Sequence, residues 1–250
     1  MPILSARTKL DLFTPRPKWI RYLLTYVALL LGTVVGKIKV SGRNHIPKKG
    51  PYIFVANHFN VSEPPFFVYA LRKPINFLVA SDQVIDWYNY WAVWLYGFIP
   101  TNRTRFGSST IKMAKKVFDD KEILGIFPEG DTQDDKLRSA KPGVIYLSTL
   151  GQVPILPMSI YGIKKGMWEY IFSGVRPTIR IRIGKPLEPF SMPKDRSKKE
   201  ITLNKIGDEI MCSIAALLPE ECHGQFKNNP LIRKFQKQNE PYSEKQINNE

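Results

Sequence analysis

The chain has 250 residues, and 43% of them are hydrophobic, which suits one domain of generous size with a packed core. Its 37 lysine and arginine residues exceed its 22 aspartate and glutamate residues, so the net charge is +15 and the surface favours an anionic partner. Two cysteines cannot form a disulfide scaffold, and the spacing of Cys212, Cys222 and His223 matches no standard zinc pattern, which favours reduced thiols over a metal site.

An uncharged, apolar segment occupies residues 22–35, with basic residues on both sides. A membrane-spanning helix needs about 20 apolar residues, and no signal-peptide cleavage site follows this shorter segment. We therefore predict that residues 1–37 form a membrane-associating segment, whose helix lies in the membrane interface with its basic flanks against anionic head groups. A helix buried in the protein core and a helix that crosses the membrane are the alternatives.

Downstream of this segment, short β-rich apolar runs alternate with helical patterns. We predict strands at residues 52–57, 76–81, 122–130, 153–162 and 178–186. We predict helices at residues 64–72, 86–97, 108–120, 142–151 and 199–221. This alternation indicates an α/β fold with a mostly parallel central sheet flanked by helices. The folded domain is predicted to span residues 38–224, with the polar residues 225–250 as a C-terminal tail.

The stretch NHFNVSE at residues 57–63 combines an imidazole with a carboxylate. Residues five apart point about 140° apart on a helix, so His58 and Glu63 can pair only if the chain bends between a strand and the next helix. The two prolines that follow support such a bend, because proline is tolerated in a first helical turn, which Ser62 can cap. A carboxylate on one ring nitrogen leaves the other able to take a proton from a substrate hydroxyl. A hydrogen-bonded structural pair is the alternative.

Three further motifs follow in order: GFIPTNR at residues 97–103, IFPEG at 126–130 and VPILP at 153–157. Together with NHFNVSE, they resemble the four ordered sequence blocks of the glycerophospholipid acyltransferase family, which contains the bacterial 1-acylglycerol-3-phosphate acyltransferases. The resemblance covers residues 38–220, and the order and spacing of the four blocks make it specific. The run KPGVIYL at residues 141–147 is also similar to the family.

The resemblance implies a role for each matching residue. His58 would be the general base that deprotonates the acceptor hydroxyl, and Glu63 would orient it. Arg103 would hold an acceptor phosphate, for which a bidentate guanidinium is well suited, with Lys141 as a second phosphate contact. The other substrate-binding residues that the blocks indicate are Asn57 and Gly97, Glu129 and Gly130 at the acceptor site, and Pro157 in the acyl-donor region. Taken singly, the arginine also fits a basic turn, the glutamate a helix cap and the proline a strand boundary.

Two positions depart from the family pattern. The family usually has aspartate where this chain has Glu63, and it has threonine and a basic residue after the third block, where this chain reads DTQDD. Asp131, Asp134 and Asp135 therefore place negative charge where an anionic acceptor would approach. This feature favours a less anionic acceptor as the alternative substrate.

The resemblance implies a membrane-associated O-acyltransferase of phospholipid biosynthesis that needs no cofactor and no metal. Acyl-CoA or acyl-carrier protein would be the co-substrate, and a lysophospholipid, first of all 1-acylglycerol-3-phosphate, the acceptor. An anionic membrane surface, at the cytoplasmic face of the inner membrane, would be the other partner. We expect no nucleic acid, because RNP-like, helix-turn-helix and zinc-finger patterns are missing. A lipid hydrolase would need a G-x-S-x-G motif, which is also missing, whereas a lipid-binding relative without turnover stays an alternative.

Overall fold

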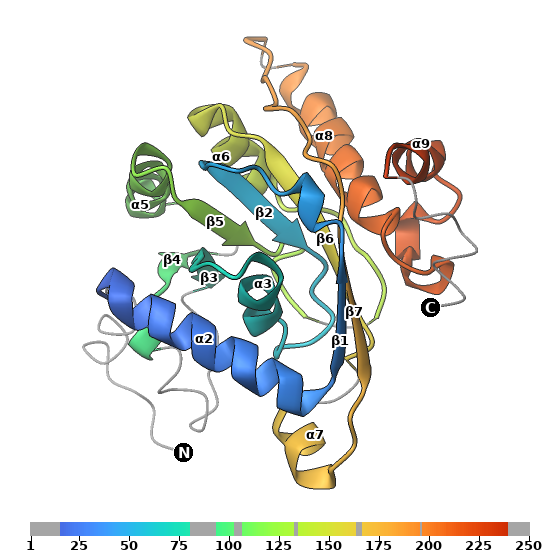
Figure 1. The fold of residues 1–250 in the computed structure, drawn as a ribbon. Coiled ribbons are helices and arrows are strands. Elements are labelled where there is room, and N and C mark those ends of the chain that lie inside the picture. Colours follow the sequence, from blue (N-terminus) through green and yellow to red (C-terminus); the bar gives the residue numbers. More distant parts are fainter. Residues whose placement is uncertain are drawn as a thin grey trace, which may run out of the picture.

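The computed structural model describes residues 16–80, 94–102, 107–132, 135–163, 167–195 and 197–239. At its centre lies a seven-stranded sheet with the strand order β1-β7-β6-β2-β5-β3-β4 (Figure 1). The strands are β1 (Lys37–Ser41), β2 (Tyr52–Ala56), β3 (Asn76–Ala80), β4 (Ile99–Thr101), β5 (Ile123–Ile126), β6 (Ile155–Tyr161) and β7 (Thr178–Ile183). Every neighbouring pair is parallel except β6 and β7, which confirms the predicted mostly parallel α/β fold.

Helices cover both faces of the sheet (Figure 1). The first face carries α2 (Lys18–Val35) and α3 (Pro64–Leu71), with α7 (Met167–Ser173) at one end. The second face carries α5 (Ser108–Asp119), α6 (Pro142–Gly151), α8 (Lys199–Ala215) and α9 (Pro230–Gln238). Short 3-10 helices lie at Arg43–His45, Glu220–Cys222 and Gly224–Phe226.

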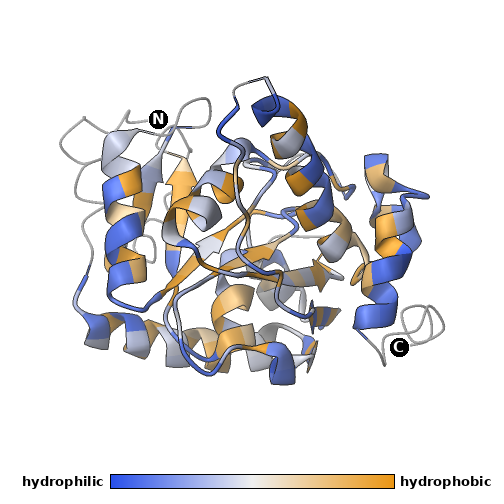
Figure 2. Ribbon diagram, turned by 90° about the horizontal axis from the view of Figure 1, so that it is seen from above, coloured by the Kyte–Doolittle hydropathy of each residue, from blue (hydrophilic) through white to orange (hydrophobic). Residues whose placement is uncertain are grey.

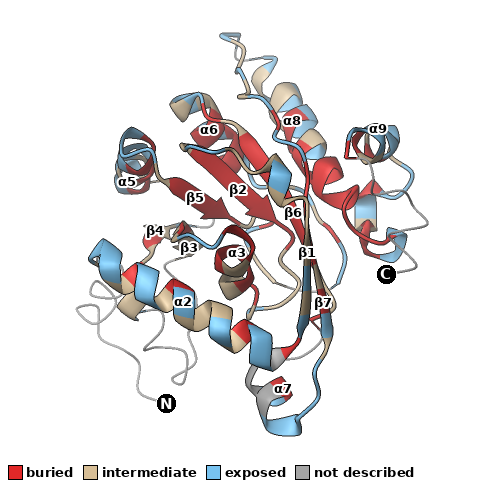
Figure 3. Ribbon diagram, in the orientation of Figure 1, coloured by how far each residue is buried: buried red, intermediate tan, exposed pale blue. Residues whose placement is uncertain are grey.

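The core has two layers because side chains of a strand alternate between the two faces of the sheet. In β2, Ile53 and Val55 pack toward α5, α6 and α8. Tyr52, Phe54 and Ala56 of the same strand pack toward α3. All five residues of β2 are buried, so this strand is apolar on both faces, as is typical of a central parallel strand. Figure 2 shows hydrophobic residues gathered on the central strands, and Figure 3 shows the same strands buried while the helices expose their outer sides.

Most predicted elements match the structure, but β1 and α7 were not predicted and the C-terminus is an error. Most of the predicted helix at residues 86–97 lies outside the described residues. The chain after residue 225 was predicted to be a polar tail, but it contains α9, which packs against α8. Asn229 caps α9 by accepting a hydrogen bond from the backbone N–H of Leu231 at 3.0 Å. Ile232 and Phe235, one helical turn apart, are buried. The folded domain therefore reaches at least Gln238, because two apolar residues at helical spacing suffice to anchor a short, otherwise polar helix.

The N-terminal apolar segment forms α2, which lies against α3. The two helices approach closely at Gly32, where a Cβ atom would come within 2.7 Å of the Tyr69 ring. On the same side Arg21 is buried and donates a hydrogen bond to Oδ1 of Asn76 at 2.9 Å. The outward side chains are exposed, namely Trp19, Tyr22, Leu23, Tyr26, Leu30 and Val34. Within the described residues, no helix combines the length and the apolar character that crossing a membrane requires.

Candidate active site

The strand order brings two of the sequence blocks together at the carboxyl ends of neighbouring strands. Strands β2 and β5 are parallel neighbours, and Val55 is in register with Ile126. The segments that follow these two strands, which carry His58 and Glu129, therefore leave the sheet side by side. Ligands of open α/β sheets bind outside the carboxyl ends of the strands, so this edge is where a site is expected.

His58 and Glu63 form the predicted pair. Nδ1 of His58 lies 3.0 Å from Oε2 of Glu63, although the two residues are five apart in the chain. The intervening loop turns at Asn60, whose carbonyl accepts from the Glu63 N–H at 3.2 Å and whose side chain accepts from the Ser62 N–H at 2.9 Å. The N-cap of α3 is Glu63 rather than Ser62, and its carboxylate makes no capping bond. That carboxylate turns back to the imidazole instead.

The buried environment of Glu63 disfavours the ionised form of its carboxyl group. The residue is 1% exposed, and burial raises its pKa well above the ordinary value of 4.5. Backbone hydrogen bonds from Asn60 and Phe59 act in the opposite direction and favour the carboxylate, while the charge of Glu129 raises the pKa further. A neighbouring imidazole that donates a hydrogen bond to the carboxylate also stabilises its charged form.

The imidazole of His58 is fixed from two more directions. Its ring stacks on the ring of Phe127, with the centroids 3.8 Å apart and an interplanar angle of 19°. Its backbone N–H donates to Oε1 of Glu129 at 3.0 Å. The side chain of His58 nevertheless keeps 17% of its surface exposed, so a substrate can reach the ring. An imidazole that is held in place and still accessible meets the geometric requirement for a general base.

Glu129 is predicted to line the acceptor site, whereas its observed contacts suit a residue that positions His58. It is 3% exposed, and its second oxygen, Oε2, accepts from the Arg138 N–H at 3.1 Å. Both carboxylate oxygens therefore bind backbone N–H groups of the protein. The motif singles out Glu129, but its partners lie 71 and 9 residues away and could not be read from the motif.

Replacing Glu129 with glutamine separates the two roles. The amide nitrogen cannot accept from a backbone N–H, so one of the two bonds is lost and His58 shifts. We expect kcat to fall about 10-fold to 100-fold, as small misplacements of a catalytic group do, with little change in KM for the acceptor. A residue that lined the acceptor site would instead raise that KM. Glu220→Gln, at an exposed ion pair with Lys227, is the matched control for steady-state kinetics of both variants.

The other predicted site residues fall into three groups. Arg103 lies outside the described residues. Asn57 is fully buried, and its amide exchanges two hydrogen bonds with the backbone of Ile160, at 2.8 and 2.9 Å. Asn57 therefore ties the first block to strand β6, and a contact with the substrate stays a prediction. Gly97 precedes β4 and has a φ of 73°, a left-handed conformation that explains the glycine on structural grounds.

The last three predicted residues differ in how far they are buried, namely Gly130, Lys141 and Pro157. Gly130 has a φ of 74°, and a Cβ atom there would come within 3.2 Å of Cγ of Lys141, which places this exposed lysine beside the third block. Pro157 is buried within β6, opposite Val55 of β2, and does not bound the strand. Its ring lies 3.1 Å from the Cβ position of Gly184, so its observed contacts belong to the core. A role in the acyl-donor region stays a prediction.

Two residues that the sequence analysis did not single out also belong to this site. Phe127 stacks on His58, and Arg138 approaches Glu129 with its Nε 3.6 Å from Oε2. The only sequence signal for Phe127 was its place in IFPEG, and Arg138 had none. The acidic segment lies nearby: Asp131 is half-buried and Asp135 is exposed, whereas Asp134 lies outside the described residues.

A family model named Acyltransferase matches residues 37–161, which is half of the chain and contains all four blocks. The chain belongs to the Acyltransferase family. A 1-acyl-sn-glycerol-3-phosphate acyltransferase of Borreliella burgdorferi is 31% identical to it over 129 residues. That match covers 50% of this chain and 51% of the relative, so the chain spans about half the length of this curated relative.

A second relative and a solved structure extend the similarity. The 1-acyl-sn-glycerol-3-phosphate acyltransferase of Bacillus subtilis is 23% identical over 168 residues, which cover 66% of this chain and 81% of the relative. The crystal structure of the 1-acyl-sn-glycerophosphate acyltransferase PlsC from Thermotoga maritima superposes with a TM-score of 0.52 at 21% identity, covering 75% of this chain and 78% of that one. At this level of identity, the superposition supports the fold alone.

Proposed function

We propose that this protein is an O-acyltransferase that moves a fatty acyl group from an acyl thioester to the hydroxyl of a lysophospholipid, with 1-acylglycerol-3-phosphate as the acceptor. Membership of the Acyltransferase family supports the reaction class, and the names of the two curated relatives support the acceptor. The observation that carries the proposal is the 3.0 Å contact between Nδ1 of His58 and Oε2 of Glu63 at the carboxyl edge of the sheet.

In this proposal the pair of His58 and Glu63, here called the dyad, accepts one proton from the acceptor hydroxyl and later donates it to the leaving group. With Nδ1–H donated to Glu63, the lone pair of His58 is on Nε2, which takes the proton of the acceptor hydroxyl as its oxygen attacks the thioester carbonyl carbon. A carbon–oxygen bond forms and a tetrahedral oxyanion results. Collapse of this intermediate breaks the carbon–sulfur bond, and Nε2–H returns the proton to the leaving thiolate. Glu63 stabilises the imidazolium between the two steps, and neither step calls for a cofactor or a metal.

The charges around the third block bear on the acceptor. Arg138 and Lys141 flank it as cations, and Arg138 donates through a guanidinium nitrogen to the carbonyl of Asp131 at 2.6 Å. A phosphate near His58 could use such cations, which supports an anionic acceptor. Asp131 and Asp135 favour the alternative, an acyltransferase for a less anionic acceptor, because like charges repel an incoming phosphate.

Acyl transfer by the purified protein in detergent tests the proposal. Labelled acyl-CoA and labelled acyl-carrier protein would be offered separately, each with a panel that contains 1-acylglycerol-3-phosphate and lysophospholipids with zwitterionic head groups. Label in a diacyl product establishes the reaction and identifies both donor and acceptor. If folded protein transfers label to none of these acceptors from either donor, the proposed function is wrong and a lipid-binding relative without turnover takes its place.

We further propose that α2 lies in the interface of an anionic membrane, at the cytoplasmic face of the inner membrane. Support comes from its row of exposed apolar side chains, which recurs at helical spacing from Trp19 through Tyr26 to Val34. Aromatic and aliphatic residues on one side of a helix are typical of helices that lie in the head-group region. The net charge of +15 would add attraction to anionic lipids.

Replacing Leu23 and Leu30 with serine should weaken vesicle binding. Both side chains are more than half exposed, so the change removes apolar surface without opening the core. Partial burial of each leucine in lipid is worth on the order of 1 kcal/mol, so we expect binding to fall about tenfold or more in the double variant. Co-sedimentation with phosphatidylcholine–phosphatidylglycerol vesicles measures it. Ile201→Ser removes an equally exposed aliphatic side chain from α8 and is the control. Unchanged binding of the double variant would contradict the proposal.

A further inference from the structure

A second site lies at the end of the sheet opposite the dyad. A cavity of about 200 Å³ opens between α2, the loop before β2 and the segment before β5. Tyr52, the first residue of β2, and Ile123, the first residue of β5, line it, whereas His58 and Glu129 follow the other ends of these strands. Tyr52 and His58 are six positions apart along a largely extended stretch, a span of about 20 Å, so the cavity is separate from the active site.

The walls of the cavity are strongly cationic. Five lining side chains are positively charged and one is negatively charged, namely Lys18, Arg21, Lys48, Lys73 and Lys121 against Glu122. The single carboxylate is already paired: Lys18 lies 2.7 Å from one of its oxygens, and Asn76 donates to the other at 2.9 Å. In the described parts of the chain, Lys48, Lys73 and Lys121 form no ion pair. The cavity therefore carries excess positive charge, which an anion bound between these side chains would neutralise.

Two buried donors in the cavity wall lack partners. The hydroxyl of Tyr52 and Nε of Arg21 have no hydrogen-bond partner among the residues that the structure describes, although the two residues are only 1% and 6% exposed. The other guanidinium nitrogens of Arg21 are occupied, by Asn76 and by the carbonyl of Ile75. Buried polar groups are nearly always satisfied, so each of these donors indicates a missing acceptor. Burial also raises the pKa of Tyr52, which keeps its hydroxyl protonated and able to donate.

These observations indicate the chemistry of the ligand. A phosphate group has several acceptor oxygens around one centre of negative charge, which matches a tyrosine hydroxyl, an arginine N–H and flexible lysine ammonium groups. The cavity is smaller than the roughly 300–1,000 Å³ of pockets that hold drug-sized ligands, so it has room for a phosphate and its nearest substituents only.

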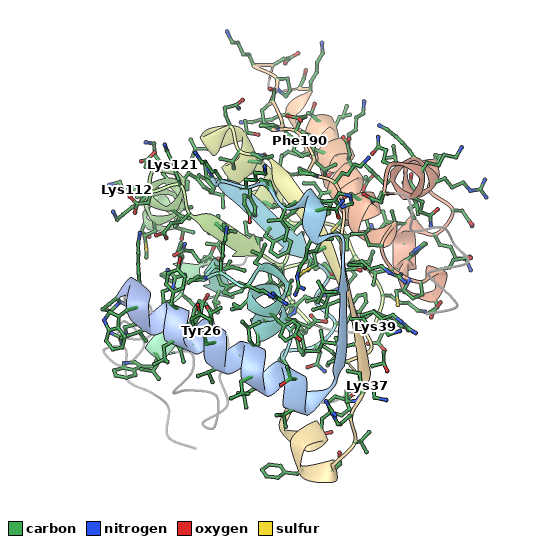
Figure 4. All side chains as sticks on the ribbon, viewed as in Figure 1. Tyr26, Lys37, Lys39, Lys112, Lys121 and Phe190 are labelled. Carbon is green, nitrogen blue, oxygen red and sulfur yellow. The ribbon has the colours of Figure 1, made fainter. Side chains whose placement is uncertain are left out.

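The position of the cavity offers two sources for such a phosphate. Tyr22 lines the cavity and also belongs to the exposed apolar row of α2. In Figure 4, Lys121, which lines the cavity, is labelled near the start of β5, and Tyr26 is labelled on α2. Lys37 and Lys39, which do not line the cavity, are labelled on the far side of the sheet, on β1. We propose that this cavity is a second, non-catalytic site that binds a phosphate group, taken either from a phospholipid head group or from a free phosphate compound.

Thermal unfolding of the protein in inorganic phosphate tests the site, with chloride used to hold ionic strength constant. A ligand that binds only the folded state raises Tm with its concentration, and the dependence yields Kd. We expect Tyr52→Phe and Lys48→Gln each to raise Kd for phosphate about tenfold, as expected for loss of a hydrogen bond or charge to an anion. Lys49→Gln, an exposed neighbour of Lys48 that does not line the cavity, should change Kd by less than about twofold.

The variant Tyr52→Phe also guards against a purely structural explanation. It removes a hydroxyl that has no partner in the described residues, so without phosphate the variant should unfold at the same temperature or higher than the unchanged protein. If phosphate fails to stabilise the protein, or if Lys49→Gln weakens binding as much as Lys48→Gln, the proposal is overturned.

A vesicle experiment then distinguishes the two sources. Binding of Lys48→Gln and Lys49→Gln to phosphatidylcholine vesicles would be compared with and without phosphatidylglycerol. A loss of phosphatidylglycerol-dependent binding in Lys48→Gln alone, with competition by inorganic phosphate, supports a head-group site. Weaker phosphate binding with unchanged vesicle binding supports a site for a free phosphate compound.

Discussion

Replacing His58 with alanine is expected to lower kcat for acyl transfer by about 10³-fold to 10⁴-fold. Without Nε2, no group on the protein takes the proton of the acceptor hydroxyl, and general-base catalysis of this kind contributes up to about four orders of magnitude. KM for both substrates should change little, because His58 acts in the transition state. Initial rates with a labelled acyl thioester measure the effect. The fold should survive, since the side chain of His58 is partly exposed and lies at the edge of the sheet.

His45→Ala is the matched control for this variant. His45 lies in the 3-10 helix before β2, and its Nδ1 is 2.8 Å from the carbonyl of Ile183. It is therefore a hydrogen-bonded histidine of this protein that the reaction does not use, and its loss should leave kcat within about threefold. If His58→Ala keeps a tenth or more of the activity, another group is the base and the dyad is structural.

Replacing Glu63 with glutamine should separate catalysis from stability. The amide can donate to Nδ1 of His58, which moves the ring proton to Nε2 and leaves the wrong nitrogen basic. We expect kcat to fall by about 10³-fold to 10⁴-fold, the scale seen when a triad carboxylate becomes an amide. The folded state should become more stable at neutral pH, by on the order of 1 kcal/mol, because a buried carboxylate is replaced by a neutral group of the same size.

The pH dependence of unfolding gives the sign of this effect. The pKa of Glu63 is raised in the folded protein, so between its ordinary value and the raised value the folded state binds more protons than the unfolded state. Stability therefore falls as pH rises through this window. Glu63→Gln lacks this loss, and its advantage in Tm over the unchanged protein should grow from pH 4 upward. An advantage that stays constant with pH would show that burial does not shift this carboxyl.

Glu63→Asp tests whether the local backbone depends on the longer side chain. Glutamate spans the loop at Asn60 and reaches Nδ1 at 3.0 Å, while Oε1 also accepts from the Phe59 N–H at 3.3 Å. Aspartate is one methylene shorter and would retract both oxygens. We expect a loss in kcat of about 10-fold to 100-fold without the tautomer change that glutamine causes. Activity equal to that of the unchanged protein would show that the loop adapts to either carboxylate.

Much of the fold could be predicted from local signals. The strand at β2 and the helix at α6 follow from an apolar run with β-rich composition and from a segment that starts with proline and ends with glycine. Such signals favour a local backbone conformation within a few residues of the chain, so they can be recognised in the sequence alone. They failed at α9 because only two apolar residues anchor that helix, too few to mark a period in a polar background.

The candidate site depends on contacts that local sequence signals cannot predict. His58 and Glu63 are five residues apart, so their pairing could be argued from a bend between a strand and a helix. The roles of Phe127 and Glu129 depend on β5 lying beside β2, with the partners about 70 residues apart in the chain. Neither the stacking on His58 nor the hydrogen bond to its N–H is encoded near either residue.

By itself, therefore, the sequence determined which elements form, which residues are able to transfer a proton, and the family blocks in their order. Only the tertiary structure decided that Asn57 and Glu129 hydrogen-bond to distant backbone groups. It also decided that five cations line one cavity with a tyrosine hydroxyl that has no partner among the described residues, at the far end of the same strands. The physical reason is that periodicity and turn residues act through short stretches of backbone. Hydrogen bonds, stacking and buried charge instead depend on which strands become neighbours when the sheet closes over its two hydrophobic layers.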